Sequence, residues 1–244
     1  MTRPVPASPY AVPGFYEAAL AGGRHRDIVG GRWDETGRLQ LALLRAEGME
    51  PRHRLLDIGC GALRLGVKAV PFLDPGNYWG TDASAALMRH GREVELGDRA
   101  RLPAHQLVED ADFAFPCVPA EIDFAIAFGV FTHLPPGALE RCLASVRGRF
   151  PGLTAFLFTV FAGEGPGPLR QPDGVVTHAA RPPYHRPLAG VLAAASAAGF
   201  AVSAREARLP RGQVLIVARP DGGAGRAFES PSQGASTRLA PGPT

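Results

Sequence analysis

Residues 54–66 constrain this chain more than any other stretch, because a short apolar run there meets two glycines and then a helical pattern. The run 55–58 is typical of a buried strand. Gly59 and Gly61 predict a tight turn, since glycine lets the backbone adopt unusual angles and approach a ligand closely. A helix is predicted from about residue 63, and the N–H groups at a helix start carry partial positive charge. The stretch therefore predicts a nucleotide-binding corner.

Downstream of this corner, apolar runs alternate with helical patterns. Strands without polar alternation, separated by helices, indicate a parallel sheet that is covered on both faces. Only about eight residues separate the last two runs, too few for a helical crossover, so we expect an antiparallel final strand. The predicted strands are 53–58, 77–81, 105–108, 122–128, 153–161, 200–204 and 213–218, and the predicted helices of this part are 63–71, 84–95, one opened by Pro135-Pro136, and 188–198.

Helix boundaries and buried faces are predicted from capping residues and apolar spacing. A short helix over 15–21 is followed by a loop over 25–33, and Asp34 is predicted to cap the next helix, which ends at Gly48. The apolar face of that helix is predicted to be Leu39, Ala42, Leu43 and Ala46. Ser84 is predicted to cap a helix with Leu87, Met88 and Val94 as apolar positions, and the helix after Pro136 is predicted to bury Leu139, Cys142, Leu143 and Val146.

The chain divides into four predicted segments around one domain. Residues 1–13 are proline-rich and predict an irregular arm, 14–48 a helical N-terminal cap, 49–219 the sheet domain, and 220–244 a disordered tail. Within the domain, 162–186 is rich in glycine and proline and unusually long for a connector, which favours a functional lid over a disordered insertion.

Composition excludes several classes of protein. With 244 residues and 45% hydrophobic residues, the chain can bury a sizeable core. The net charge of +3 comes with no basic run, and Lys68 is the only lysine, so we do not expect a nucleic-acid partner. Three cysteines without a C-x-x-C pair argue against disulfides and a zinc site and fit a reducing cytoplasm. We expect neither a signal peptide nor a membrane span.

Carboxylates narrow the ligand of the glycine corner. A dinucleotide motif would need a glycine where Arg64 stands, and no Gly-Lys-Ser/Thr ending of a phosphate-binding loop follows. Asp57, two residues before Gly59, would repel a pyrophosphate and suits a ligand with positive charge. Asp82 ends the second strand, 21 residues after Gly61, where a carboxylate can accept both hydroxyls of a ribose. The alternative for Asp82 is an acid that only starts the next turn.

With these features the sequence resembles the class I S-adenosylmethionine-dependent methyltransferases, over about residues 28–219. The resemblance implies an α/β fold: a Rossmann-like, doubly wound, mostly parallel seven-stranded sheet with an antiparallel last strand and an N-terminal helical cover. Many members carry a third glycine where this chain has Ala62-Leu63. The matching stretches are Leu55 to Gly61, Tyr78 to Asp82, Ile122 to Ala127 and Phe131 to Pro135.

The resemblance also implies a set of residues around the cofactor S-adenosylmethionine and its product S-adenosylhomocysteine. Asp82 would hold the ribose, and an acid after the third strand would bind the adenine. That acid is Asp110 or Asp112, and Asp110 is preferred because it directly follows the strand. Phe113 would stack near the adenine or belong to the core, and Arg64 would meet the cofactor carboxylate or lie on the surface. The other implied cofactor-binding residues are Asp57, Gly59, Cys60, Gly61, Ala83 and Phe128.

Catalytic candidates follow from the position of polar side chains at the far end of the sheet. His133, just past the fourth strand, has an ordinary pKa near ~6.5 and would act as a base near neutrality, or else only start the next helix. Tyr184 and His185, at the end of the long segment, are second candidates, and His178 is weaker. Trp33 would close the cap over the cofactor or anchor it in the core. No metal is required.

The resemblance implies a methyltransferase, and the default acceptor is a small molecule. A hydroxyl of a sugar or secondary metabolite is favoured, because the Asn/Asp-Pro-Pro element of base and amide methylation is missing after the fourth strand. The alternatives are an RNA- or protein-directed methyltransferase, a nicotinamide-dependent oxidoreductase, and a binding protein that kept the fold without catalysis. We expect a cytoplasmic monomer or homodimer.

Overall fold

The computed structural model describes residues 8, 10, 12–205 and 209–222. Its helices are α1 (Phe15–Ala21), α2 (His25–Ile28), α3 (Trp33–Ala46), α4 (Gly66–Phe72), α5 (Ala85–Val94), α6 (Ala138–Arg149) and α7 (Leu188–Ala197), with the short 3-10 turns η2 (Arg99–Arg101), η3 (Ala104–Gln106) and η4 (Pro210–Gly212). Its strands are β1 (Leu55–Ile58), β2 (Tyr78–Asp82), β3 (Leu107–Glu109), β4 (Phe124–Ala127), β5 (Ala155–Ala162), β6 (Leu169–Arg170), β7 (Val176–Thr177), β8 (His185–Arg186), β9 (Phe200–Arg205) and β10 (Val214–Pro220).

The strands form the mostly parallel sheet that the sequence predicts. Its order is β3-β2-β1-β4-β5-β10-β9, and the short β8 pairs with the end of β5 as an eighth strand. β1 to β5 run parallel, whereas β10 runs antiparallel to both β5 and β9, so the prediction of an antiparallel last strand is confirmed. The carboxyl ends of β1, β2 and β4 therefore share one edge, where ligands bind in open α/β sheets.

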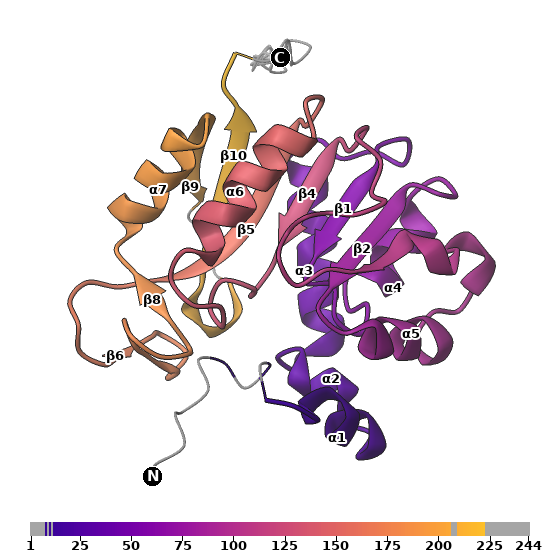
Figure 1. Cartoon of the computed structure of the whole chain (residues 1–244), viewed down its shortest axis with the longest axis horizontal. Coiled ribbons are helices and arrows are strands. Elements are labelled where there is room, and N and C mark those ends of the chain that lie inside the picture. Colours follow the sequence, from indigo (N-terminus) through magenta and orange to yellow (C-terminus); the bar gives the residue numbers. More distant parts are fainter. Residues whose placement is uncertain (1–7, 9, 11, 206–208, 223–244) are drawn as a thin grey trace, which may run out of the picture.

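Helices cover the sheet on both faces (Figure 1). One buried cluster lies between the sheet and α6 and α7, and includes Leu56 of β1 and Leu143 of α6. The other lies between the sheet and α3, α4 and α5, and includes Leu55 of β1, Leu44 of α3 and Met88 of α5. Neighbouring residues of β1 thus point to opposite faces and both are buried, as expected for a central parallel strand.

The predicted capping of α5 and the predicted inner face of α6 are confirmed. The Ser84 hydroxyl accepts a hydrogen bond from the Leu87 amide at 3.2 Å, and the four apolar positions of α6 are buried. Two details are wrong. Val94 is 60% exposed, and the two prolines precede α6, which begins only after Gly137 with its φ of 90°. A left-handed residue at that point ends the proline turn before the helix can start.

The N-terminal cap departs from the prediction at three points. The predicted loop 25–33 contains the one-turn helix α2, and α3 already begins at Trp33, so Asp34 lies in its first turn, where the helix dipole favours a carboxylate. A Cβ atom on Gly37 would lie 2.6 Å from the Arg64 carbonyl oxygen, so α3 approaches the core through its smallest side chain. The fully buried residues of α3 are Thr36, Gly37, Gln40 and Leu44. Of the predicted face, Leu39 and Leu43 are partly buried against the core, whereas Ala42 and Ala46 are exposed.

The long segment 162–186 contains regular secondary structure. It folds into the antiparallel pair β6 and β7 and returns to the sheet as β8. Most of the predicted arm 1–13 and of the predicted tail 220–244 lies outside the described residues. Within the part of the chain that the structure describes, no helix has the length and apolar character needed to cross a membrane.

Candidate functional site

The glycine corner lies at the carboxyl end of β1. Gly59 and Gly61 have φ values of 70° and 55°, which are accessible to glycine without strain. The amides of Gly59 and Cys60 both donate to the Thr81 carbonyl of β2, at 2.7 and 3.0 Å, which fixes the turn against the neighbouring strand. Leu63, at the place of the third glycine of the related motif, is also left-handed with a φ of 67°. The backbone thus keeps the turn of the motif although the residue has changed.

Asp82 ends β2 beside this corner. One of its carboxylate oxygens accepts a hydrogen bond from the Gly61 amide and the other from the Ser84 amide, both at 3.0 Å. Burial raises the pKa of this carboxyl to about 6, while the backbone amides oppose the shift. Within the described residues Asp82 has no basic ion-pair partner, so each oxygen retains capacity for one further donor.

Asp57 lies directly below the corner and is 3% exposed. Its carboxylate accepts a hydrogen bond from the Tyr78 hydroxyl at 2.7 Å. Burial raises the pKa of Asp57 to about 7, and the Tyr78 hydrogen bond and the charge of Arg64 oppose that shift. Asp57 on β1 is buried and Asp82 on the neighbouring β2 is half-buried. Two neighbouring carboxyls with raised pKa values are typical of a functional site.

Arg64 links the corner to the N-terminal cap instead of lying on the surface. Its guanidinium donates to the Val29 carbonyl and, at 3.4 Å, to the Gly31 carbonyl, and it lies 5.9 Å from the ring centre of Phe128. Burial lowers the pKa of Arg64 to about 10. Since Val29 also contacts Gly61, the cap forms one wall of the site and Arg64 holds it there.

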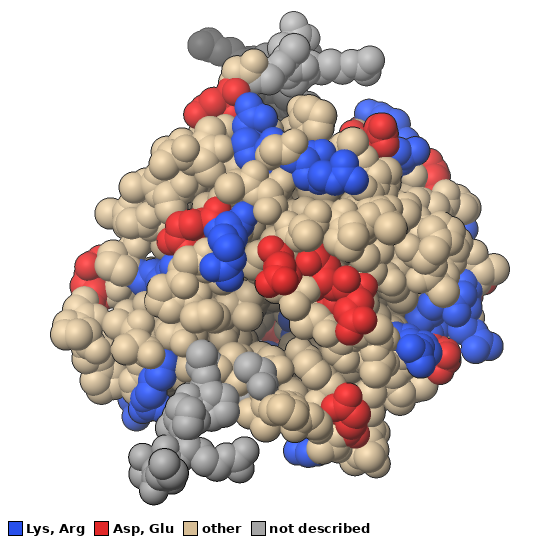
Figure 2. Space-filling model, in the orientation of Figure 1, with Lys and Arg blue, Asp and Glu red and all other residues tan. Residues whose placement is uncertain are grey.

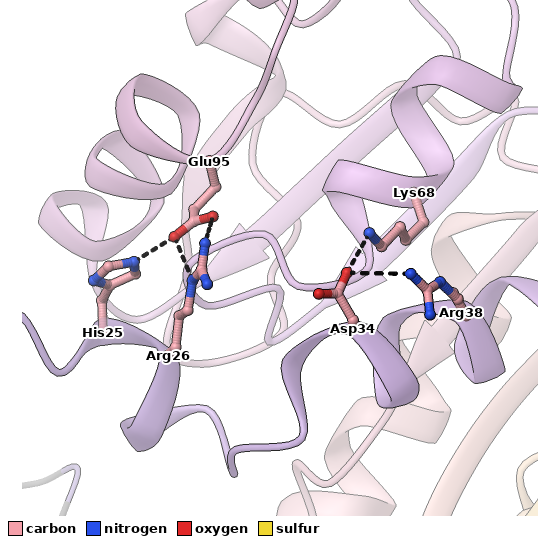
Figure 3. Close-up of polar contacts among 6 residues, drawn as sticks. All are labelled: His25, Arg26, Asp34, Arg38, Lys68 and Glu95. Atoms are coloured by element: carbon pink, nitrogen blue, oxygen red, sulfur yellow. Dashed lines mark hydrogen bonds and ion pairs between the residues drawn. The ribbon is translucent and has the colours of Figure 1, made fainter.

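Two ion-pair clusters anchor the cap to the core (Figure 3). Glu95, at the end of α5, accepts hydrogen bonds from His25 at 2.6 Å and from two nitrogens of Arg26 at 2.7 and 2.8 Å. Asp34 accepts a hydrogen bond from Lys68 of α4 at 2.6 Å. Trp33 packs under the Arg26 guanidinium, 5.2 Å from its ring centre. Its contacts therefore belong to the anchoring of the cap.

His133 lies in the loop that follows β4, and its ring faces the N-terminal cap. Its ring packs edge-on against the Tyr10 ring with centroids 5.2 Å apart, and the Tyr10 hydroxyl donates to the Ile28 carbonyl at 2.9 Å. Burial, with the charge of Arg211, lowers the pKa of His133 to about 4. The imidazole is therefore neutral at pH 7 and can accept a hydrogen bond.

Tyr184 and His185 lie apart from the glycine corner. Both ring nitrogens of His185 are within hydrogen-bond distance of groups in the long segment itself, the Thr177 hydroxyl at 3.0 Å and the Gly165 carbonyl at 3.2 Å. The Tyr184 amide donates to the Thr132 carbonyl at 2.7 Å, which ties the segment to the loop of His133. Both side chains also line a cavity of about 310 Å³ between the starts of α6 and α7.

The two candidate adenine acids differ in their surroundings. The Asp110 carboxylate accepts three backbone hydrogen bonds from its own loop, from the amides of Asp112, Ala114 and Phe115, at 2.8 to 3.2 Å. Asp112 is exposed. Phe113 is buried in the left-handed region with a φ of 62° and packs against Phe131. Asp110 thus shapes the loop, and either acid remains a candidate for the adenine.

Several residues that the structure brings to this edge could not be recognised from the sequence. Tyr10 lies in the proline-rich arm, and Arg211 lies in a turn between the last two strands. Thr159 and Gln213 resemble ordinary strand residues, yet the Thr159 hydroxyl accepts a hydrogen bond from the Gly129 amide and donates one to Gln213, at 2.7 and 2.5 Å. For Thr159 and Gln213, the one signal in the sequence is a polar residue within an otherwise apolar run.

No protein-family model matches the chain. Solved structures match most of its length. A TehB-like SAM-dependent methyltransferase from Corynebacterium glutamicum is 16% identical with a TM-score of 0.57, over 86% of this chain and all of that one. Magnesium protoporphyrin IX methyltransferase from Synechocystis, with bound SAM, is 15% identical with a TM-score of 0.59, over 89% of this chain and all of that one.

A third match is 1,6-didemethyltoxoflavin-N1-methyltransferase from Burkholderia thailandensis, solved with its acceptor and S-adenosylhomocysteine. It is 21% identical with a TM-score of 0.58, over 91% of this chain and 93% of that one. At these identities the likeness concerns the fold. The predicted Rossmann-like methyltransferase fold is confirmed.

Proposed function

Since the chain has the fold of the class I S-adenosylmethionine-dependent methyltransferases, we propose that it binds S-adenosylmethionine and transfers the methyl group to a small-molecule acceptor. The observation that carries the proposal is the pair Asp57 and Asp82. Asp57 is buried and Asp82 half-buried at the glycine corner, and their pKa values are raised to about 7 and about 6. Carboxyls that are removed from solvent to this degree and lack a salt-bridge partner within the described residues suit a ligand that brings positive charge and hydroxyl donors.

The residues of the corner fit this cofactor. Gly59 and Gly61 would let the backbone lie against its amino-acid part, and Asp57 would favour its ammonium group. Each oxygen of Asp82 accepts one backbone hydrogen bond and can accept one more, as two ribose hydroxyls require. When bound, the cofactor supplies a methyl group on a sulfonium centre, and S-adenosylhomocysteine is the product.

His133 is proposed to orient the acceptor. With its pKa lowered to about 4, the imidazole is a weak proton acceptor at neutral pH, because general bases work best with pKa values near the working pH. A neutral ring nitrogen still accepts a hydrogen bond from an acceptor hydroxyl and can align it. The low pKa therefore favours positioning over the proton removal that the sequence suggested.

A small-molecule acceptor is favoured over a nucleic acid. On the face shown in Figure 2, the described arginines and lysines form small groups with acidic side chains near several of them, not one continuous basic surface, whereas RNA-binding surfaces gather basic residues. The Synechocystis and Burkholderia proteins are named for small acceptors, a porphyrin and a toxoflavin precursor. Methylation of oxygen, a cytoplasmic location and a monomer or homodimer complete the proposal.

Calorimetric titration separates this proposal from a nicotinamide-dependent enzyme. We expect S-adenosylmethionine and S-adenosylhomocysteine to bind at micromolar concentrations and NAD not to bind. Asp57 would repel the pyrophosphate of NAD, whereas it would attract the ammonium group of the adenosyl ligands. Binding of NAD without binding of either adenosyl ligand would contradict the proposal.

Binding of S-adenosylmethionine should depend on pH. Below the raised pKa values of Asp57 and Asp82, about 7 and 6, the free protein holds protons that the cationic ligand displaces. We expect affinity about 10- to 100-fold lower at pH 5 than at pH 8, since one pKa unit corresponds to ~1.36 kcal/mol. Titration in two buffers with different ionisation enthalpies would count the released protons.

The free protein should show the opposite trend in stability. A carboxyl whose pKa is higher in the folded than in the unfolded chain holds extra protons when folded, so stability falls as the pH rises from ~4 to ~7. Asp57→Asn should flatten that fall. For the binding prediction, an affinity for S-adenosylmethionine that does not change between pH 5 and pH 8 would show that neither carboxyl contacts the ligand.

A further inference from the structure

The turn η4 joins three parts of the chain beside His133. The Arg211 guanidinium donates to the Gly30 carbonyl of the cap at 3.0 Å, and the Arg211 amide donates to the carboxylate of Asp173, in the β6–β7 hairpin, at 2.8 Å. Arg32 of the cap reaches the same carboxylate at 3.6 Å. The cap, the hairpin and the turn therefore form one rim around the edge of the sheet.

Arg211 keeps a backbone conformation that favours glycine. Its φ and ψ are 65° and 10°, and Gly212, which follows it, has a φ of 76°. A non-glycine residue in the left-handed region is held at a cost, and such residues gather at binding sites. Glycine would adopt this backbone conformation without strain. The presence of an arginine side chain at this position therefore calls for an explanation.

Two arginines bring positive charge near Tyr10 and His133. The positive charge of Arg211 contributes to the lowered pKa of His133. The charges of Arg211 and Arg64 oppose the rise that burial causes in the pKa of Tyr10. The acid that raises the pKa of Tyr10 is Asp82. Its two oxygens accept hydrogen bonds from backbone amides, and it is proposed to bind the ribose of the cofactor. Of the five donors of the Arg211 guanidinium, one is used by Gly30 within the described residues.

Gln213, two residues further on, adds a second side-chain donor. Its side-chain carbonyl accepts a hydrogen bond from the Thr159 hydroxyl at 2.5 Å, which fixes the orientation of the amide. The Gln213 residue is 8% exposed, and no hydrogen bond from its Nε2 is found within residues 12–205 and 209–222. This Nε2 lies 4.0 Å from the place of a Cβ atom on Gly129, at the end of β4. The amide N–H groups are therefore held in a fixed orientation beside Gly129 and are free to donate to a ligand oxygen.

We propose that the methyl acceptor is an anionic small molecule whose carboxylate or other oxyanion binds Arg211, while Gln213 Nε2 donates to a second acceptor oxygen beside Gly129. The inference rests on the proposed function and names its substrate class. Arginine binds oxyanions through two parallel hydrogen bonds, which gives the site both charge and direction. Asp173 does not neutralise this arrangement, because it is held by the Arg211 amide and by Arg32.

The experiment compares acids with matched neutral compounds. Hydroxy acids, aliphatic and aromatic, and their carboxamides are titrated into the protein saturated with S-adenosylhomocysteine. We expect the acids to bind at least about tenfold more tightly than their amides, as for a lost charged hydrogen bond. Arg211→Gly should abolish that preference without loss of thermal stability, because glycine keeps the amide bound to Asp173 and adopts the left-handed φ freely.

Arg52→Ala is the matched control. Arg52 is an exposed arginine before β1 that pairs with Glu50, so its loss changes the net charge equally and should leave the preference intact. Equal binding of acids and amides, no binding of any acid, or an unchanged preference in Arg211→Gly would overturn the inference. Failure of S-adenosylhomocysteine itself to bind would instead contradict the proposed function.

Discussion

Replacing Asp82 with asparagine is expected to weaken the binding of S-adenosylhomocysteine by about 10- to 100-fold, the loss of one or two hydrogen bonds to a charged group. The carboxylate accepts the Gly61 and Ser84 amides with one lone pair of each oxygen and would accept the ribose hydroxyls with the others. Asparagine keeps the shape of the side chain, but its NH2 group replaces one of the two acceptor oxygens. This donor would then face a ribose hydroxyl and a backbone N–H, neither of which it can accept from. Calorimetry at pH 8, where the wild-type carboxyl is ionised, measures the effect.

Asp98→Asn provides the control for this substitution. Asp98 caps the short turn η2 by accepting the Ala100 amide at 3.0 Å, so it has the same local role as Asp82 without a place at the glycine corner. We expect Asp98→Asn to leave affinity unchanged. If Asp82→Asn bound the ligand as tightly as the wild type, the ribose role would be excluded.

The sequence predicted the sheet and the corner because both are encoded locally. Continuous apolar runs identify central parallel strands, and glycines next to a strand identify a turn that other residues avoid. Asp82 followed from register, since β1 and β2 pair in parallel with Asp57 opposite Gly80 and Ile58 opposite Thr81. Even Leu63, which departs from the glycine motif, keeps a left-handed φ of 67°. The surrounding turn therefore overrides the local preference.

The walls of the site could not be predicted, because they depend on contacts between distant segments. Arg64 is predicted at the cofactor or on the surface, and that prediction does not include its hydrogen bonds to carbonyls of the cap 33 and 35 residues earlier. Arg211 meets Gly30 across 181 residues. Arginines that bind backbone carbonyls leave no partner signal in the sequence, since any residue supplies a carbonyl. The prediction for α3 missed the buried positions Gly37 and Gln40 for a similar reason, because close approach to the core buries them.

Gly91→Ala is expected to destabilise the protein by about 1–3 kcal/mol, although alanine is the better helix former. Gly91 lies inside α5, and a Cβ atom there would stand 2.3 Å from the Ala62 carbonyl oxygen. Ala62 follows directly on Gly61, so α5 packs backbone against backbone on the glycine corner. No side chain can move aside to relieve the overlap, and the helix or the corner must shift. Thermal and urea unfolding measure the loss.

Gly148→Ala tests the same substitution without the overlap. Gly148 lies in α6, and a Cβ atom there would meet nothing within 4 Å, so helix propensity alone should act and the variant should gain up to about 1 kcal/mol. Opposite signs for the two glycines would assign the cost at Gly91 to packing on the corner. Because that packing sets the position of the Gly61 amide, which donates to Asp82, Gly91→Ala should also weaken S-adenosylhomocysteine binding, whereas Gly148→Ala should not. A stabilised Gly91→Ala variant with unchanged affinity would show that the corner does not depend on close contact with α5.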